Sequence, residues 1–544
     1  MAKFITAREA AALIPDGATV GLAGMGLSGW AEEVACAIRD RYKETGHPCN
    51  LNLKQGSAMG DWGYGNNFIG WNRSKREGGP DTEHGNRGVT RFGEAGPGLI
   101  TRWTGAHVGS AFTLRDQAIR NELKSWCLPQ GVIINLWREI GAGRPGLITK
   151  TGLGTFVDPR VEGGCMNQAA RDSGETVVKV IEFEGEEYLF YPSFKCDVAL
   201  LRGTIADEHG NISFAHESVI NEGFAVANAV KHHGGIVIVQ VEYLAQANSL
   251  NPKEIKIPGN LVDYVVQARD PMSCWQAEGD YWEPSFSGQI RKPMKAIEPL
   301  PFDERKVICR RVAMELKKGD TVNLGVGMPA DVSKVVNEEG LIEHVLMSTE
   351  SGMVGGVPSA LPSFGSAYNP EAIITPNEMF DFISGGGLNM TCLGIGEVDK
   401  YGNNNVSRMG KRLTGPGGFI DITATTPKVI FAGTLMGKAK LQVGDGKLTV
   451  LEEGTIQKFV DTVGQVTFAG QYSPEGQEVL YVTERAVFKL IDGKVTLIEV
   501  APGIDVEKDV IAAMGFRPEI SPELKTMDPG IFCETWGGLG EYLN

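Results

Sequence analysis

The chain has 544 residues, of which 42% are hydrophobic and 22% charged, and its formal net charge at pH 7 is −15. This length and composition are typical of a globular protein with more than one domain and sizeable cores. The excess of acidic residues argues against nucleic acids and anionic membranes as partners, because both require a concentrated basic face.

Cysteine usage and hydropathy indicate a cytoplasmic protein. The nine cysteines are odd in number, spread from Cys36 to Cys533 and never form a C-x-x-C pair, so we expect free thiols. His232 and His233 lack a third ligand at zinc spacing, and we predict no metal site. No apolar run reaches about 18 residues, and the first residues lack the apolar core of a signal peptide. We therefore expect no membrane contact.

A glycine-rich turn near the N-terminus raises the question of a dinucleotide site. Residues 24–29, GMGLSG, match the G-x-G-x-x-G pattern between a predicted strand at 18–22 and a predicted helix at 31–42. Such a site also needs an acidic residue about 20 positions further on to hold the ribose. The next predicted strand ends instead in Lys54 and Gln55. We therefore interpret the match as accidental.

The chain contains an internal repeat. Residues 15–26, PDGATVGLAGMG, recur as 318–329, KGDTVNLGVGMP, and residues 206–213 recur in the same order as 398–407. A repeat of this kind indicates one supersecondary unit used twice. We therefore predict an α/β fold of two related α/β/α halves with mostly parallel sheets.

The two halves are expected to differ in length. We assign residues 1–283 to the N-terminal half, 284–304 to a polar, proline-bearing linker, and 305–544 to the C-terminal half. The stretch between the repeated motifs is longer in the first half. Its Gly-, Arg- and Asn-rich segment at 56–98 is therefore the candidate insertion.

One carboxylate lies among glycines in the second half. Residues 345–358, VLMSTESGMVGGVP, place Glu350 at the end of a predicted apolar strand. An isolated Glu in this position is often only a solvated loop residue. Here the nearby glycines would let a ligand approach closely, and an ionised Glu in a water-poor pocket can act as a nucleophile if donors face the developing oxyanion.

Several sequence blocks carry a family resemblance. In the second half these are NLGVGMP, STESGMVGGVP, FISGGGLNMTCLGIGEVDKYGNNNVS and GPGGFIDI, which resemble family I CoA-transferases. The first half, with GLITRWTGAHVGS, WCLPQGVIINLWREIGAGRPG and GLGTFVDPR, resembles the single-chain form of these enzymes, the propionate (acetate) CoA-transferases. The similarity runs from about Ile5 to the C-terminus.

The resemblance implies an activity and a site. CoA would pass reversibly from a short-chain acyl-CoA to a small acid of the acetate, propionate, butyrate or lactate class, by ping-pong kinetics through a glutamyl-CoA thioester on Glu350. The implied oxyanion donors are the N–H groups of Val326 and Gly418 and the side chain of Gln130. Because Gln130 belongs to the other half, the active site is expected between the halves. CoA and acyl-CoA act as substrates, and no cofactor is bound permanently.

A second set of residues is expected to contact CoA. These are Gly325, Gly327, Gly385, Gly386, Gly387, Asn405 and Gly417. The triplet and the Asn can equally be a turn and a strand end. The triplet is flanked by Ser384 and Asn389 where related enzymes usually have acidic residues, and the 56–98 segment is longer than expected, so acyl and acceptor specificity stay open.

Two other functions compete with transfer. An acyl-CoA hydrolase could use the same fold, and so could a non-catalytic binder of CoA or a sugar phosphate, although Glu350 argues against the latter. We leave His107 off the catalytic set because a structural histidine explains it equally well. The resemblance further implies a homodimer or homotetramer, and Trp103 and Trp137 could lie either on a contact surface or in the core.

Overall fold

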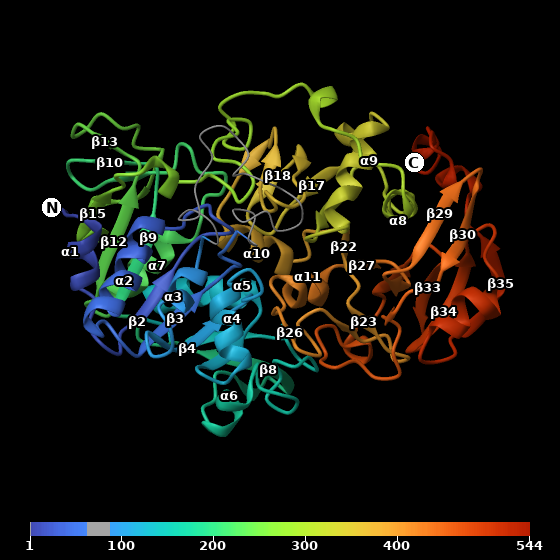
Figure 1. Ribbon diagram of the computed structural model, residues 1–544, viewed down its shortest axis with the longest axis horizontal. Helices are drawn as coiled ribbons and strands as arrows, with labels where there is room; N and C mark the ends of the chain where they lie inside the picture. The colour runs from blue at the N-terminus through green and yellow to red at the C-terminus, as the bar shows by residue number, and fades with distance from the viewer. Residues whose placement is uncertain (1, 62–86, 544) are drawn as a thin grey trace.

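The computed structural model describes residues 2–61 and 87–543. Figure 1 shows the N-terminal half, in blue to green, beside the C-terminal half, in yellow to red. Each half is built around one large sheet. Most of the candidate insertion at 56–98 lies outside the described residues, and its described end includes helix α3 (Thr90–Glu94).

The N-terminal sheet has eight strands in the order β1-β15-β12-β9-β2-β3-β4-β5, and every neighbouring pair is parallel. Its strands are β1 (Lys3–Phe4), β2 (Thr19–Leu22), β3 (Leu51–Gln55), β4 (Ile100–Gly105), β5 (Lys124–Cys127), β9 (Val198–Arg202), β12 (Ile236–Val241) and β15 (Tyr264–Gln267). The other helices of this half are α1 (Ala7–Ala12), α2 (Glu32–Thr45), α4 (Phe112–Ile119), α5 (Gln130–Gly141), α6 (Gln168–Asp172) and α7 (Gly223–His232).

The C-terminal sheet has ten strands in the order β21-β18-β17-β16-β22-β27-β32-β33-β34-β35, with a parallel centre from β17 to β32. Its strands are β16 (Thr321–Leu324), β17 (Leu346–Ser348), β18 (Met353–Val354), β21 (Ala372–Ile373), β22 (Met390–Gly394), β27 (Lys428–Ala432), β32 (Glu478–Val482), β33 (Ala486–Ile491), β34 (Lys494–Val500) and β35 (Glu519–Thr526). Its helices are α8 (Glu304–Ala313), α9 (Val332–Glu338), α10 (Pro376–Ser384) and α11 (Phe419–Thr425).

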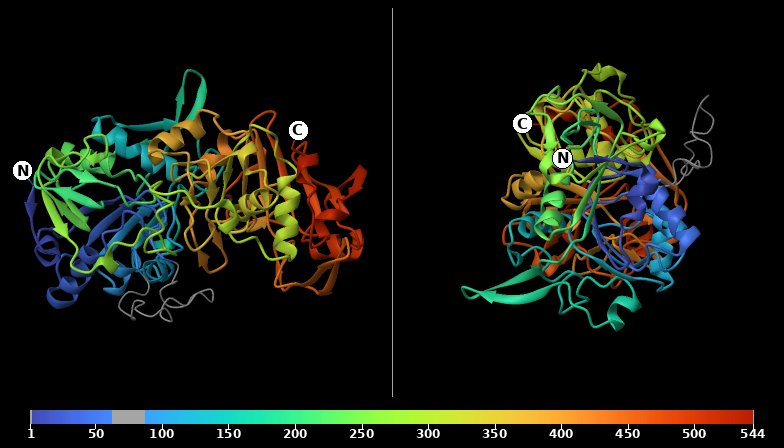
Figure 2. Two further views of the ribbon diagram at one scale, coloured as in Figure 1. Left: turned by 90° about the horizontal axis from the view of Figure 1, so that it is seen from above. Right: turned by 90° about the vertical axis from the view of Figure 1, so that its left-hand side faces the viewer.

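Small sheets and hairpins surround the two large sheets. In the N-terminal half they comprise β6 (Gly146–Thr149), β7 (Lys179–Phe183), β8 (Glu186–Pro192), β10 (Ile205–Asp207), β11 (Ile212–Ser213), β13 (Tyr243–Ala245) and β14 (Ile255–Ile257). In the C-terminal half they comprise β19 (Val357–Pro358), β20 (Ala367–Tyr368), β23 (Glu397–Val398), β24 (Asn404–Asn405), β25 (Arg408–Met409), β26 (Arg412–Leu413), β28 (Met436–Gly437), β29 (Lys440–Gly444), β30 (Lys447–Glu452) and β31 (Ile456–Gln457). The hairpin β7–β8 projects from the body of the molecule (Figure 2).

The predicted duplication is confirmed in the strand order. In the N-terminal sheet β2 lies between β3 and β9, and in the C-terminal sheet β16 lies between β17 and β22, with parallel pairing in both places. The sheets are mostly parallel, as expected for strands joined by helical crossovers. The fold is therefore α/β, with two related halves.

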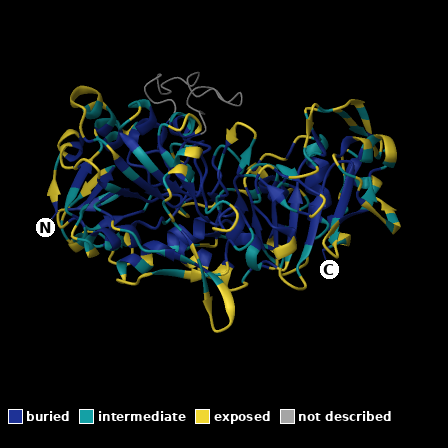
Figure 3. Cartoon of the chain, turned by 90° about the horizontal axis from the view of Figure 1, so that it is seen from below, coloured by how far each residue is buried: buried dark blue, intermediate teal, exposed yellow. Residues whose placement is uncertain are grey.

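Buried strands form the core of each half (Figure 3). All five residues of β9, VALLR, are buried, as is typical of a central parallel strand covered on both faces. In β2, Gly21 leaves room for α5, because a Cβ there would lie 2.9 Å from the ring of Trp137. Trp137 and Trp103 are both fully buried in the N-terminal core. The idea that they lie on a contact surface is therefore wrong, because apolar packing already covers them.

Backbone hydrogen bonds join the two halves along one loop of the C-terminal half. Thr414 O accepts from Val108 N at 2.8 Å, and Gly417 N donates to Ala106 O at 2.9 Å. Residues 284–304, the predicted linker, run along the second half and include a short 3₁₀ turn at Met294–Ala296. The domain boundaries themselves stay a prediction. Within the described residues, no helix has both the length and the apolar character needed to cross a bilayer.

Candidate active site

A cavity of about 270 Å³ lies between the halves and is lined by residues from both. The N-terminal half contributes Met25, Gly26, Ala58, His107, Gln130 and Glu278. The C-terminal half contributes Gly325, Val326, Glu350, Phe364, Leu393, Gly394, Ile395, Gly396, Val406, Met409, Arg412, Thr414, Gly415, Pro416, Gly417, Gly418, Phe419 and Ile422. The predicted location of the site, between the halves, therefore coincides with this cavity.

Glu350 follows β17 at the carboxyl end of the C-terminal sheet, where ligands of open α/β sheets usually bind. Its side chain faces the cavity but is only 6% exposed to solvent. The neighbouring residues anchor the turn, since Ser351 Oγ donates to Gly365 O at 2.5 Å and Thr349 N donates to Met353 O at 3.1 Å. The backbone on either side of the carboxyl group is thus held in place.

The glycines after Glu350 form this turn and do not line the cavity. Gly352 has φ +105°, and a Cβ there would collide with Ile374 O. A Cβ at Gly356 would collide with Tyr368 O. The expectation that these glycines admit a ligand is therefore wrong, because close contact with the backbone of their own half already explains them.

Burial changes the ionisation of Glu350. Desolvation raises the pKa of its carboxyl group to about 7, and the adjacent Asn323 side chain offsets only part of this rise. Among the described residues, none forms a hydrogen bond with Glu350 Oε2 or with Asn323 Nδ2. A buried carboxylate oxygen without a partner is costly, and it is free to react with an electrophile that enters the cavity.

Two backbone donors lie in the cavity wall. Gly325 N donates to Cys392 O at 2.9 Å and ends the β16 ladder, whereas no described residue accepts from the N–H of Val326, the next residue. The N–H of Gly418, at the start of α11, is likewise without an acceptor among the described residues. A Cβ at Gly418 would lie 3.5 Å from Glu350 Cγ, so Gly418 packs beside the Glu350 side chain.

Gln130 reaches the same place from the other half. It is the first residue of α5, and its Nε2 donates to Ser57 Oγ at 2.9 Å. Its backbone N donates to Gly417 O at 3.0 Å, and a Cβ at Gly417 would lie 3.7 Å from its Oε1. Gln130 and Glu350 therefore flank two consecutive residues, Gly417 and Gly418. The structure brings together Glu350, Gln130, Val326, Gly418, Gly325 and Gly417.

The structure separates the glycine triplet from this group. Gly385, Gly386 and Gly387 end α10, where Gly386 has φ +83° and donates to Ile383 O at 3.0 Å. They precede β22, whereas the cavity lies at the other end of that strand, beside Gly394. The triplet is thus a helix C-cap, and its predicted contact with pantetheine or phosphates has no support from this geometry.

Asn405 also has a structural explanation. It is fully buried, and its Nδ2 donates at 2.8 Å both to Glu397 Oε2 and to Arg408 O. These bonds hold the turn that brings Val406 and Met409 into the cavity. Gly327 follows Val326 with φ +88°, and it does not line the cavity.

Sequence reasoning missed much of the apolar lining. Met25 and Gly26 come from the first copy of the glycine turn, and Val326 comes from the second. The internal repeat was therefore a usable signal that both turns meet at one site. Glu278 offered no such signal, although a Cβ at Gly26 would collide with its carboxyl group. His107, left off the catalytic set, does line the cavity, where burial and the nearby Arg412 lower its pKa to about 3.

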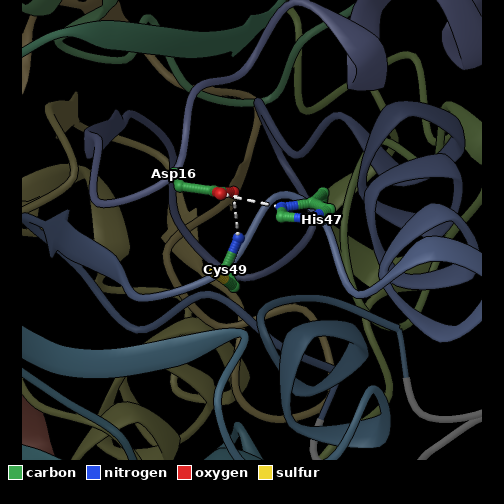
Figure 4. A group of neighbouring side chains, drawn as sticks. All are labelled: Asp16, His47 and Cys49. Atoms are coloured by element: carbon green, nitrogen blue, oxygen red, sulfur yellow. Dashed lines mark hydrogen bonds and ion pairs between the residues drawn. The ribbon is translucent and has the colours of Figure 1, made fainter.

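One group of potential metal ligands occurs among residues 2–61 and 87–543, and it lies away from this cavity. Asp16, His47 and Cys49 come together at the amino ends of β2 and β3 (Figure 4). Asp16 accepts from Cys49 N at 2.9 Å and lies 2.7 Å from His47 Nδ1. Both carboxylate oxygens are thus already used to cap a turn. The prediction of no metal site stays a prediction.

Comparisons with known proteins identify the family of the chain. Residues 95–268 match the family model of coenzyme A transferase. The chain is 58% identical to caffeate CoA-transferase of Acetobacterium woodii over 99% of both chains. It is 36% identical to acetate CoA-transferase YdiF of Escherichia coli K12, over 98% of this chain and 96% of that one.

Solved structures give the same result. The acyl-CoA transferase YdiF of Escherichia coli O157:H7, in a thioester complex with CoA, matches with a TM-score of 0.88 and 35% identity, over 99% of this chain and 97% of that chain. Sequence and fold thus agree over nearly the whole chain, and the protein belongs to the coenzyme A transferase family.

Proposed function

We propose that the protein transfers CoA from an acyl-CoA to a carboxylic acid, with Glu350 as the nucleophile. One observation carries this proposal. A buried carboxyl group lies in a cavity between the halves, one of its oxygens has no partner among the described residues, and Gly418, whose N–H has no acceptor among those residues, packs beside its side chain. This is the arrangement that covalent catalysis at a carbonyl group needs.

The proposed first half-reaction has two steps. The Glu350 carboxylate oxygen attacks the thioester carbonyl carbon, and the C–S bond breaks. CoA departs as its thiolate, and an acyl-glutamyl anhydride remains on the enzyme. The thiolate then attacks the Glu350 carbonyl carbon, so that the acid leaves as its carboxylate and a glutamyl-CoA thioester remains. A second carboxylate reverses these steps and takes CoA away. Each new bond replaces one of similar energy, so no external energy source is needed.

Three donors would stabilise the oxyanions of these steps. The N–H groups of Val326 and Gly418 lie in the cavity wall, and the amide of Gln130 faces it from the other half. Removal of one donor of this kind usually costs about 10²–10³-fold in rate. Because the donors belong to backbone turns and to a helix start, they need little reorganisation when charge develops.

The substrate acid has two candidates. The family resemblance favours a short-chain acid of the acetate, propionate, butyrate or lactate class. The relative named caffeate CoA-transferase favours a larger aryl-propenoic acid. Met25, Phe364 and Met409 make much of the wall apolar, and flexible Met side chains adapt to ligands of different shape. CoA and acyl-CoA remain substrates in both cases.

We also propose a cytoplasmic homodimer or homotetramer. The projecting hairpin β7–β8 and the adjacent β6 expose two large apolar side chains, Phe183 at 58% and Ile148 at 49%. Exposed apolar groups on a projecting element are candidates for a subunit contact.

Our first prediction concerns the covalent intermediate. Incubation with an acyl-CoA and no acceptor should leave CoA attached to Glu350, and borohydride should then reduce the thioester and abolish activity. Peptide mass spectrometry locates the adduct. Glu350→Gln should fold normally yet form no adduct, whereas Glu222→Gln, which changes a buried carboxyl group outside the cavity, should form it fully. An adduct on a cysteine, or a fully active Glu350→Ala enzyme, would overturn the mechanism.

A second prediction follows from the pKa of about 7 for Glu350. Only the ionised carboxylate attacks, so kcat/KM for the acyl-CoA should be level above pH 7 and fall about tenfold per pH unit well below it. Burial also raises the pKa of Glu222 to about 7, and Glu222→Gln therefore serves as the control that should keep the profile unchanged. A profile that is flat down to pH 5 would contradict the assignment.

A panel of acceptor acids separates the candidate substrates and the hydrolase alternative. Transfer requires that CoA release from acyl-CoA depend on an added acid, whereas a hydrolase releases free CoA without one. Ala58→Leu narrows the cavity and should lower kcat/KM for aryl-propenoic acids by about tenfold or more while acetate is little affected. Equal losses for both acids would show that the acyl group does not reach Ala58.

The oligomeric state can be measured by light scattering coupled to gel filtration. We expect a mass of two or four chains at micromolar concentration. Phe183→Glu should shift the protein towards the monomer without lowering its melting temperature, since this side chain is exposed within one chain. A single-chain mass for the unmodified protein would remove the oligomer proposal.

A further inference from the structure

Helix α5, which begins with Gln130, has no side-chain cap of its own. The residue before it is Pro129, which makes no side-chain cap bond, and no described side chain of this half bonds to the first turn. The first N–H groups of a helix need partners from elsewhere. Here they come from the C-terminal half, because Gln130 N donates to Gly417 O at 3.0 Å and Gly131 N donates to Asp421 Oδ2 at 3.1 Å.

Asp421 is built into this contact. It lies in α11, is 3% exposed, and approaches the start of α5 closely enough that a Cβ at Gly131 would lie 2.9 Å from its Oδ1 and 2.5 Å from Phe380 Cδ1. Burial raises the pKa of Asp421 to about 7, although backbone N–H groups of α5 oppose this. A neutral carboxyl group still accepts through its C=O oxygen, so the cap persists in both protonation states.

Other cross-half contacts hold α5 further along its length. Asn377 Nδ2 donates to Ile134 O at 2.7 Å, and Asp381 accepts from Asn135 Nδ2 at 2.9 Å and from Arg138 at 2.6 Å. These residues of α10 act one turn or more beyond Gln130. Asp421 acts on the first turn itself, next to Gln130, which lines the same cavity as Glu350.

We propose that Asp421 is a positioning residue, which caps α5 across the interface and thereby fixes the Gln130 amide beside Glu350. The segment from Gly417 to Asp421 then sets two donors at once, since it carries the Gly418 N–H and holds the helix of Gln130. This inference rests on the proposed function in one respect, the role of Gln130 as an oxyanion donor.

The test combines kinetics with a double-mutant cycle. Asp421→Ala should lower kcat by at least about tenfold, and by no more than the about 10²–10³-fold that loss of a whole donor costs. It should change KM for acyl-CoA by less than about threefold. Asp421→Asn keeps an acceptor oxygen and should restore most of kcat. The double variant Asp421→Ala/Gln130→Ala should be no slower than Gln130→Ala, because one residue acts through the other.

A matched control and a physical readout accompany these rates. Asn377→Ala removes a cross-half contact beyond the first turn and should keep kcat. Hydrogen exchange at the amides of residues 130–132 should speed up in Asp421→Ala and not in Asn377→Ala. If Asp421→Ala does not fold, Asp421→Leu, which keeps a side chain of similar size but removes the acceptor oxygens, should give the same pattern.

The outcomes separate two failures. Multiplicative losses in the cycle, or unchanged kcat and exchange in Asp421→Ala, would overturn the positioning role even though the wild-type enzyme still forms its Glu350 adduct. A wild-type enzyme without an adduct on Glu350 would overturn the proposed function instead. In that case, faster hydrogen exchange at residues 130–132 of Asp421→Ala would still support the capping of α5 by Asp421, without a role in catalysis.

Discussion

The site depends on the cost of burying the Glu350 carboxyl group. In water this group would be ionised and well solvated, whereas in the cavity it has lost most of its solvent and its pKa is near 7. A poorly solvated carboxylate is a better nucleophile, and the free energy that its burial costs must be recovered by the rest of the fold. The hydrogen-bonded turn around Glu350 and the packed interface between the halves supply stabilising free energy that offsets this cost.

Backbone hydrogen bonds join the halves next to the site, and a half-buried ion pair of Arg408 with Glu162 also crosses the interface. Thr414 and Gly417 exchange hydrogen bonds with the loop at 106–109 of the other half, and Gly417 O also receives the N–H of Gln130. Exposed ion pairs, such as Arg138 with Asp381, add little in water. Because glycines allow this close approach, a larger side chain at Gly415 would meet Ala106 O at 2.5 Å. The halves are therefore held in one register at the point where the donors converge.

The sequence predicts the fold through its repeat and predicts the centre of the site through Glu350. The location of Gln130 across the cavity was likewise predictable, but only from the family resemblance. The predictions from glycines were wrong, since the triplet at 385–387 ends a helix and Gly352 avoids a clash with the backbone of Ile374. A glycine in a sequence signals close approach or positive φ without saying whether the neighbour is a ligand or the protein itself. Glu278 and Asp421 were missed because their neighbours in the fold, Gly26 and Gly131, lie far from them in the sequence.

The duplication also shows which position of the N-terminal half corresponds to Glu350. Strands β2 and β16 both begin with Thr-Val. The Thr of β2, Thr19, pairs with Asn52 of β3, and the Thr of β16, Thr321, pairs with Leu346 of β17. Gly56 and Glu350 each stand four residues after these partners, so Gly56 occupies the position of the carboxylate in the N-terminal half. A Cβ at Gly56 would lie 2.6 Å from the carboxyl group of Glu222, the N-cap residue of α7, which fills that space. The N-terminal half thus keeps the glycine turn and the strand register of the repeat. It contributes Gln130 and part of the cavity wall, whereas the proposed nucleophile, Glu350, belongs to the C-terminal half.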